Sequence, residues 1–140
     1  VQAARLADIL PALLQAGCRV VVDHFGRPDP ALGVADPGFQ YLLRQAAGGQ
    51  VWIKLSAPYR NWSGPACAAS GREAARRLLD ACGPERLMWG SDWPHTEHRH
   101  LASYPAATRW LDDWIDDPAQ RRAVLADTPL RLFQFQGDSR

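Results

Sequence analysis

The sequence predicts an α/β fold built on a parallel sheet, and two observations support this prediction. Three short runs rich in β-branched and aromatic residues begin near residues 19, 51 and 87. They are about 32 and 36 residues apart with a helical segment between each pair, which is typical of successive βαβ units. Each run also ends in polar residues, as expected where the carboxyl ends of parallel strands form a ligand-binding edge.

The first half of the chain alternates helix and strand. Apolar residues recur at helical spacing before each strand, and Gly and Pro mark the ends of the helices. Asp and Pro in succession are typical of an N-cap followed by a first helical residue. The predicted elements are a helix over residues 2–16 with a kink or restart at Pro11, a strand over 19–24, a helix from Asp36-Pro37 to Gly48-Gly49, and a strand over 51–56.

The second half continues this pattern and then becomes helical. Residues 57–69 contain Pro and Gly and are expected to form a loop. The pair Ser70 and Glu73 is typical of a capping box, so the next helix is expected to begin there. The remaining predictions are the end of that helix at Gly83-Pro84, a strand over 87–92, a helix around 110–115, another from Asp117-Pro118, and a last one from Thr128-Pro129 to near Phe135.

Composition indicates one globular domain and excludes several classes of function. The chain has 140 residues, 46% of them hydrophobic, and a formal net charge of +1, so it lacks the basic excess of a nucleic-acid-binding protein. No run approaches the roughly 18 to 20 apolar residues of a membrane span. Three cysteines without a C-x-x-C motif favour a reducing compartment, so we expect a cytoplasmic protein. With no nucleic acid or membrane expected as a partner, the expected partner is a small-molecule substrate.

The polar strand ends predict a site before any relative is considered. His24, Ser56 and Asp92 all lie at the carboxyl ends of predicted parallel strands. Alternation along a strand places His24 on the face of Val20 and Val22, and Asp92 on the face of Met88 and Gly90. If both faces point inward, the two side chains converge. By the same reasoning Lys54 and Ser56 are expected to face the interior or mouth of a barrel.

Four segments together resemble a known family. The runs VVVDHFGRP, VWIKLSAPYR and LMWGSDWPHT, followed by DTPLRLFQF, resemble the amidohydrolases related to 2-pyrone-4,6-dicarboxylate hydrolase, a lactonase built on a TIM (β/α)8 barrel. The resemblance implies that residues 1–140 form a partial domain, the C-terminal half of such a barrel with about three of its eight βα units. The family's His-x-His after the first strand has no counterpart here, and unpaired barrel edges would favour self-association.

The resemblance also implies roles for individual residues. His24 matches the family's middle-strand histidine and Asp92 its final aspartate, so Asp92 is expected to be the general base and His24 to polarise the carbonyl or bind a metal. Should the protein be metal-dependent, His24 and Asp92 are the expected ligands of one divalent ion, Zn or Mn. A metal-independent reaction is the alternative.

Residues around the predicted pair are candidates for substrate binding. Arg60 matches an arginine that grips a substrate carboxylate in related lactonases. Arg27 is expected to do the same or to hold its own loop, and Lys54 to pair with Asp92, bind an anion or extend from the sheet edge. Tyr59 borders the site and is expected to pack there. Another pair, His98 and His100, is expected to lie in a solvated loop rather than to bind metal.

Three functions remain open from the sequence. The first is hydrolysis of a lactone of a carboxylated small molecule by attack of water. The second is metal-dependent decarboxylation by an enzyme of the same superfamily. The third is different in kind, because a truncated half-barrel that lacks the first strand would have no activity.

Overall fold

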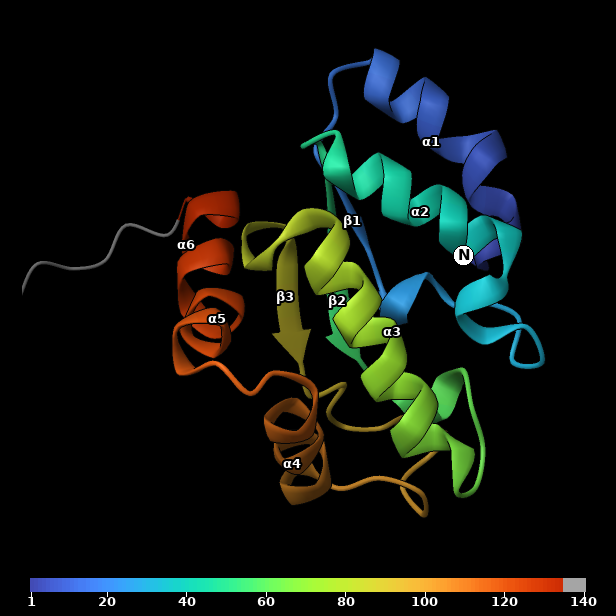
Figure 1. Cartoon of the computed structure of the whole chain (residues 1–140), viewed down its shortest axis with the longest axis vertical. Helices are drawn as coiled ribbons and strands as arrows, with labels where there is room; N and C mark the ends of the chain where they lie inside the picture. The colour runs from blue at the N-terminus through green and yellow to red at the C-terminus, as the bar shows by residue number, and fades with distance from the viewer. Residues whose placement is uncertain (135–140) are drawn as a thin grey trace, which may run out of the picture.

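The sheet has three parallel strands in the order of the sequence. The computed structural model describes residues 1–134, and its strands are β1 (Val20–Val22), β2 (Val51–Ser56) and β3 (Leu87–Gly90). Strand β2 lies in the centre, paired with β1 on one side and β3 on the other (Figure 1). The predicted α/β fold with a parallel sheet is therefore confirmed, and the carboxyl ends of all three strands lie at one edge.

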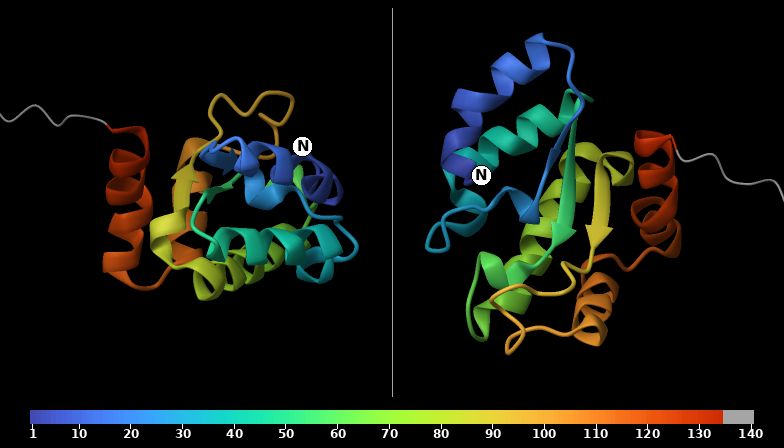
Figure 2. Two further views of the ribbon diagram at one scale, coloured as in Figure 1. Left: turned by 90° about the horizontal axis from the view of Figure 1, so that it is seen from above. Right: turned by 180° about the vertical axis from the view of Figure 1, so that it is seen from behind.

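Helices cover one face of this sheet. Figure 2 (right) shows the strands in front of α2 and α3, with no helix of residues 1–134 over the near face. None of the described helices is long and apolar enough to cross a membrane. The helices are α1 (Leu6–Gln15), α2 (Pro37–Ala47), α3 (Ala66–Cys82), α4 (Tyr104–Trp114), α5 (Pro118–Arg122) and α6 (Thr128–Phe133).

The core lies between the sheet and its helices. In β2 the residues that alternate toward the helices are fully buried, and Ile53 is paired with Val22 of β1 and Leu87 of β3. Residues paired across a parallel sheet point to the same face, so these three side chains form one apolar layer. Facing them are buried helix residues, including Phe39, Leu42 and Leu78.

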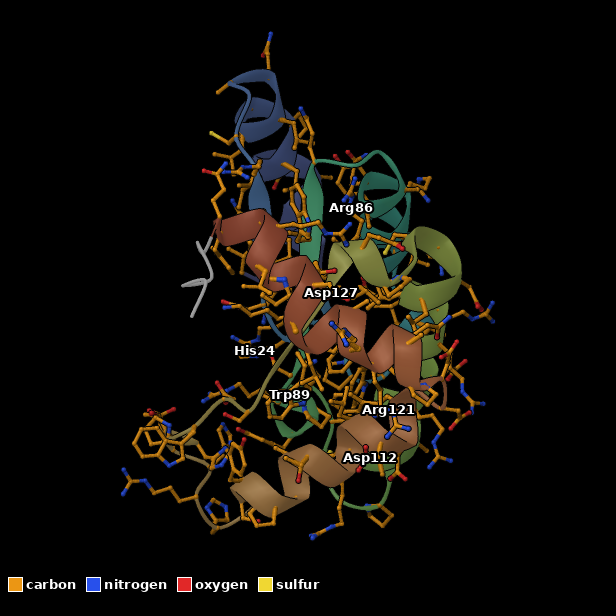
Figure 3. All side chains as sticks on the ribbon, turned by 90° about the vertical axis from the view of Figure 1, so that its left-hand side faces the viewer. His24, Arg86, Trp89, Asp112, Arg121 and Asp127 are labelled. Atoms are coloured by element: carbon orange, nitrogen blue, oxygen red, sulfur yellow. The ribbon has the colours of Figure 1, made fainter. Side chains whose placement is uncertain are left out.

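The C-terminal helices are joined to one another by polar contacts. Arg121 on α5 donates from Nη1 to a carboxylate oxygen of Asp112 on α4 at 2.6 Å (Figure 3). A π-helical turn, Ala123–Asp127, connects α5 to α6, and Thr128 at the start of α6 donates to the carbonyl of Pro84 at 2.9 Å. These contacts fix the helices beside β3.

Several predicted boundaries were wrong. Strand β1 ends at Val22 and β3 at Gly90, two residues before each predicted end, because the backbone turns there to carry His24 and Asp92. Helix α3 begins at Ala66, after Pro65, whose φ of −62° already suits a helix. Ser70 therefore lies inside the helix, and the predicted capping box is absent. The predicted end of the last helix near Phe135 lies outside the described residues.

A buried aromatic residue anchors the turn that follows β1. His24 and Phe25 both have a positive φ, 52° and 57°, a conformation that L residues rarely adopt. The Phe25 ring is fully buried and contacts Trp62 and Trp114, with ring centroids 5.8 and 5.1 Å apart. Burial of this ring offsets the strain of the turn.

The Phe25 anchor can be tested by truncation. Phe25→Ala should lower the free energy of unfolding by about 3–5 kcal/mol, because it removes a buried ring from a packed aromatic group. Leu32→Ala is a control, since Leu32 is 51% exposed and its truncation should change stability by no more than about 0.5 kcal/mol. Urea denaturation followed by circular dichroism measures both, and equal effects would contradict the assignment.

Candidate active site

The site begins at the turn after β1. The side-chain amide of the buried Asn61 donates to the carbonyl of His24 at 2.8 Å and so ties this turn to the loop after β2. The His24 ring lies at the carboxyl edge of the sheet, where it is labelled in Figure 3. Its Nδ1 lies 2.8 Å from the hydroxyl of Ser56, the last residue of β2. His24 is therefore held at two points, its carbonyl by Asn61 and its ring nitrogen Nδ1 by Ser56.

His24 and Asp92 converge, as the sequence predicted. The Nε2 atom of His24 lies 3.8 Å from Oδ1 of Asp92, and both side chains are mostly buried. The sequence predicted that His24 reaches the site from the same face of the strand as Val22, and this was wrong. Val22 pairs with Ile53 and so faces the helices. Simple alternation would place His24 on that face too. The left-handed turn redirects its ring to the opposite face, where Ser56 lies.

The other carboxylate oxygen of Asp92 is held by two donors. Its Oδ2 accepts a hydrogen bond from the Tyr59 hydroxyl at 2.6 Å and one from Nε of Arg60 at 2.7 Å. Burial alone would raise the pKa of Asp92, but the hydrogen bonds from Tyr59 and Arg60 and the positive charge of Arg60 outweigh it and lower that pKa. Asp92 is thus ionised at neutral pH, with Oδ1 turned toward His24.

The environment of His24 favours its neutral form. Burial lowers the pKa of the ring below 6.5, and the positive charges of Arg60 and Arg27 act in the same direction. The negative charges of Asp92 and Asp23 oppose this shift without cancelling it. A neutral imidazole can donate from one nitrogen and accept at the other, so the bond to Ser56 determines what Nε2 does.

Arg60 and Tyr59 lie where predicted but are engaged with Asp92. Besides its bond to Asp92, Arg60 donates to the carbonyl of Thr96 at 3.2 Å and lies over the Tyr59 ring at 5.8 Å. Tyr59 packs at the site, as expected, and burial together with the bond to Asp92 raises its pKa. Both residues come from the turn after β2, Pro58–Arg60, and reach across to the loop after β3.

Two other predicted substrate-binding residues lie away from this cluster. Lys54 pairs with Asp23 at 2.9 Å, so its predicted pairing with Asp92 was wrong. Arg27 is exposed and lines a separate concavity of about 170 Å³ beside Gln2 and Asp36, although its charge still acts on His24. Its backbone carbonyl accepts a hydrogen bond from the amide of Ala3, so Arg27 helps to hold the loop after β1.

Sequence reasoning missed three contacts of the site. Asn61 had no recognised role, and Ser56 was known only as a polar residue at a strand end. The third contact is that of His95, three residues after Asp92, whose Nδ1 lies 3.0 Å from the Tyr59 hydroxyl. For Ser56 the available indication was its position after an apolar strand; Asn61 and His95 depend on how two loops meet, which no local pattern encodes.

The described residues supply only part of a metal site. No group of three or more His, Cys, Asp and Glu side chains that could hold a metal ion occurs among residues 1–134. Imidazole nitrogen and carboxylate oxygen are suitable zinc donors, so His24 Nε2 and Asp92 Oδ1 fit as two ligands, whereas catalytic zinc usually has three from protein. His98 and His100 lie in a loop, as predicted, but of the two only His100 is exposed. His98 is half-buried, and its ring packs against Tyr59 with the ring centroids 5.3 Å apart.

Comparison with known proteins identifies the family. A family model described as Amidohydrolase matches residues 1–135. The chain belongs to the amidohydrolase family. This amidohydrolase is 32% identical over 133 residues to a D-galactarolactone isomerase of Agrobacterium fabrum, a match that covers 93% of this chain and 45% of that protein. It is 34% identical over 124 residues to a 4-sulfomuconolactone hydrolase of Hydrogenophaga intermedia, covering 86% and 41% respectively.

Solved structures agree with this assignment. A probable 2-pyrone-4,6-dicarboxylic acid hydrolase from Acinetobacter baumannii, with citric acid bound, matches with a TM-score of 0.90 and 34% identity over 96% of this chain and 51% of that one. A zinc-bound amidohydrolase from Burkholderia multivorans matches with a TM-score of 0.81 and 27% identity, covering 97% and 51%. The chain spans about half the length of these relatives, and its sheet is part of the amidohydrolase TIM barrel, as predicted.

The depressed pKa of His24 has a measurable consequence. Because the folded chain resists protonation of this ring, the unfolded chain binds more protons below pH 6.5, and the free energy of unfolding should fall as the pH drops from 6.5 toward the folded pKa. The His24 ring should titrate below 6.5 when followed by NMR. Asp92→Asn should lower the midpoint further, since the charge of Asp92 raises it.

The matched variant is His24→Gln, which removes the titrating ring. Its free energy of unfolding should depend less on pH between about 5.5 and 7.5 than that of the unchanged chain. A titration midpoint at or above 6.5 in the unchanged chain would contradict the environment described for His24.

Proposed function

We propose that this amidohydrolase hydrolyses a lactone that carries a negatively charged group. The observation that carries the proposal is the placement of an ionised Asp92, with one free oxygen, 3.8 Å from the imidazole of His24. The names of its relatives support it, since they include a sulfomuconolactone hydrolase and a galactarolactone isomerase. Because the chain spans about half of those proteins, the experiments below concern the intact protein.

Asp92 would act as the general base. A water molecule beside Oδ1 gives its proton to that oxygen, and the resulting hydroxide adds to the carbonyl carbon of the lactone. The ring carbon–oxygen bond then breaks, and the proton on Asp92 passes to the leaving alkoxide. The product is an open hydroxy acid, and Asp92 returns to its ionised form. A low pKa suits a base that must be ionised before water arrives.

His24 would stabilise the charge that develops on the carbonyl oxygen. If the Ser56 hydroxyl donates to Nδ1, the hydrogen of the neutral ring is on Nε2, which can then donate to that oxygen. If instead Nδ1 donates to Ser56, Nε2 presents a lone pair, the form that a metal ligand requires. The Ser56 contact therefore decides between the two roles predicted for His24.

A divalent metal is the alternative source of electrophilic assistance. Bound through His24 and Asp92 together with ligands beyond residues 1–134, it would polarise the carbonyl and lower the pKa of a bound water. The zinc-bound relative supports this alternative.

With or without a metal, Arg60 would supply positive charge for an anionic group of the substrate. It would do so through the guanidinium N–H groups that do not bind Asp92 or Thr96.

The base is tested by Asp92→Asn in the intact protein. Its kcat on the lactone should fall at least about 100-fold, because an amide cannot accept the proton, while the circular dichroism spectrum stays unchanged. Asp8→Asn, at an exposed carboxylate of α1 that pairs with Arg5, is the matched control and should keep full activity. A screen of dicarboxylate and sugar lactones by pH-stat provides the substrate, and carbon dioxide release would point to decarboxylation instead. Full turnover by Asp92→Asn would remove Asp92 as the base.

We further propose that the isolated chain associates with itself. Within residues 1–134, β1 and β3 each pair with one strand only, and one face of the sheet carries no helix. Exposed apolar side chains such as Leu125 and Leu130 lie in the segment beside β3.

We also propose a reducing location such as the cytoplasm, which the three free cysteines support.

Light scattering on the purified 140-residue chain tests the association. We expect a dimer or larger species, because unpaired strand edges and uncovered apolar surface are both removed from water by pairing. Leu125→Lys and Leu130→Lys should shift the distribution toward monomer. Leu32→Lys, at an exposed residue of the loop after β1, should not. A clean monomer at high concentration would contradict this proposal.

A further inference from the structure

The Tyr59 ring is held in one position from several sides. The residue is 8% exposed and lies two positions after Ala57, whose positive φ turns the chain sharply after β2. The rings of His98 and Trp110 lie 5.3 and 5.9 Å away, and the guanidinium of Arg60 lies over its face. This packing leaves the hydroxyl as the one part of Tyr59 directed at Asp92.

The direction of the hydrogen bonds follows from what each group can donate. An ionised carboxylate has no hydrogen to give, so the Tyr59 hydroxyl must donate to Oδ2 of Asp92, at 2.6 Å. That uses its single hydrogen. His95 Nδ1 lies 3.0 Å from the hydroxyl oxygen of Tyr59, so Nδ1 must carry a hydrogen and donate it to that oxygen. This holds whether the His95 ring is neutral or charged.

His95 is itself fixed to Asp92. Its backbone N–H donates to the carbonyl of Asp92 at 2.7 Å, and the residue is 5% exposed. Its Nε2 is buried and has no hydrogen-bond partner among the described residues, so Nδ1 makes the one hydrogen bond that the structure gives this ring there. His95, Tyr59 and Asp92 thus form a closed circuit of one backbone and two side-chain contacts.

We propose that Tyr59 is a positioning residue for Asp92, and that the Nδ1–H of His95 holds Tyr59 in this role. The proposal rests on the hydrolase function proposed above. Oδ2 is occupied by Tyr59 and by Arg60, which leaves Oδ1 as the oxygen that receives the proton from water. Tyr59 touches no reacting atom. It determines which carboxylate oxygen faces the substrate.

Loss of the Tyr59 hydroxyl should affect turnover more than substrate binding. With only Arg60 left on Oδ2, the carboxylate of Asp92 can rotate about its terminal bond and present either oxygen at a poorer angle. A general base that is misoriented in this way lowers the reaction rate by about 10- to 100-fold. The substrate's charged group and carbonyl contact other residues, so KM should change little.

The kinetic test uses conservative variants of the intact protein. Tyr59→Phe should lower kcat about 10- to 100-fold and change KM by no more than about threefold. The control is Tyr104→Phe, which removes the hydroxyl of an exposed tyrosine on α4 and should match the wild type. His95→Asn places an N–H close to the position of Nδ1 and should retain most of kcat; His95→Gln places it near Nε2 and should behave like Tyr59→Phe. Wild-type kcat in Tyr59→Phe, or equal effects of the two His95 variants, would overturn the proposal.

A spectroscopic test does not depend on turnover. In ¹⁵N NMR of the chain at about pH 8, above the range in which a typical imidazole titrates, the His95 ring should be the Nδ1–H tautomer. In Tyr59→Phe that tautomer should give way to the Nε2–H form. A His95 ring in the Nε2–H form in the unchanged chain would overturn the inference. If the intact protein hydrolyses no lactone while His95 shows the expected tautomer and its loss, the proposed function fails and the arrangement of Tyr59 stands.

Discussion

The two carboxylate oxygens of Asp92 have different surroundings, and the rest of the site depends on this difference. A mostly buried carboxylate is costly unless it is hydrogen-bonded, and here both bonds fall on Oδ2. They keep the group ionised and at the same time leave Oδ1 free beside His24. The same two contacts therefore stabilise the charge and orient the base.

This arrangement requires that loops from different strands meet. Asp92 follows β3, Tyr59 and Arg60 follow β2, and His24 follows β1, so no pair of neighbouring residues could create the site. A parallel sheet solves the problem, because it brings the carboxyl ends of all its strands to one edge. The apolar layer of Val22, Ile53 and Leu87 sets the register of that edge and thus the distances across it.

The sequence was sufficient to predict the edge but not the contacts along it. The strand runs and their spacing predicted the parallel sheet, and the polar strand ends led to His24 and Asp92. Alternation failed for His24, since the strand stops at Val22 and a left-handed turn follows. Lys54 pairs with Asp23, which directly follows the adjacent strand β1, and periodicity within one strand cannot reveal such a contact. Likewise, the bonds of Asn61 and His95 depend on three-dimensional loop packing alone.

Backbone strain at the edge follows from the same requirement. Of the eight non-glycine residues with positive φ among residues 1–134, all but Gln134 lie in the loops that follow the three strands, among them His24, Ala57 and Asp92. An ordinary strand end would leave side chains on alternating faces, whereas this site needs residues of three loops on one face. Each left-handed residue redirects a side chain at a cost in conformational energy. The buried Phe25 and Tyr59 rings offset that cost, which ties the packing of these aromatic rings to the chemistry at the edge of the sheet.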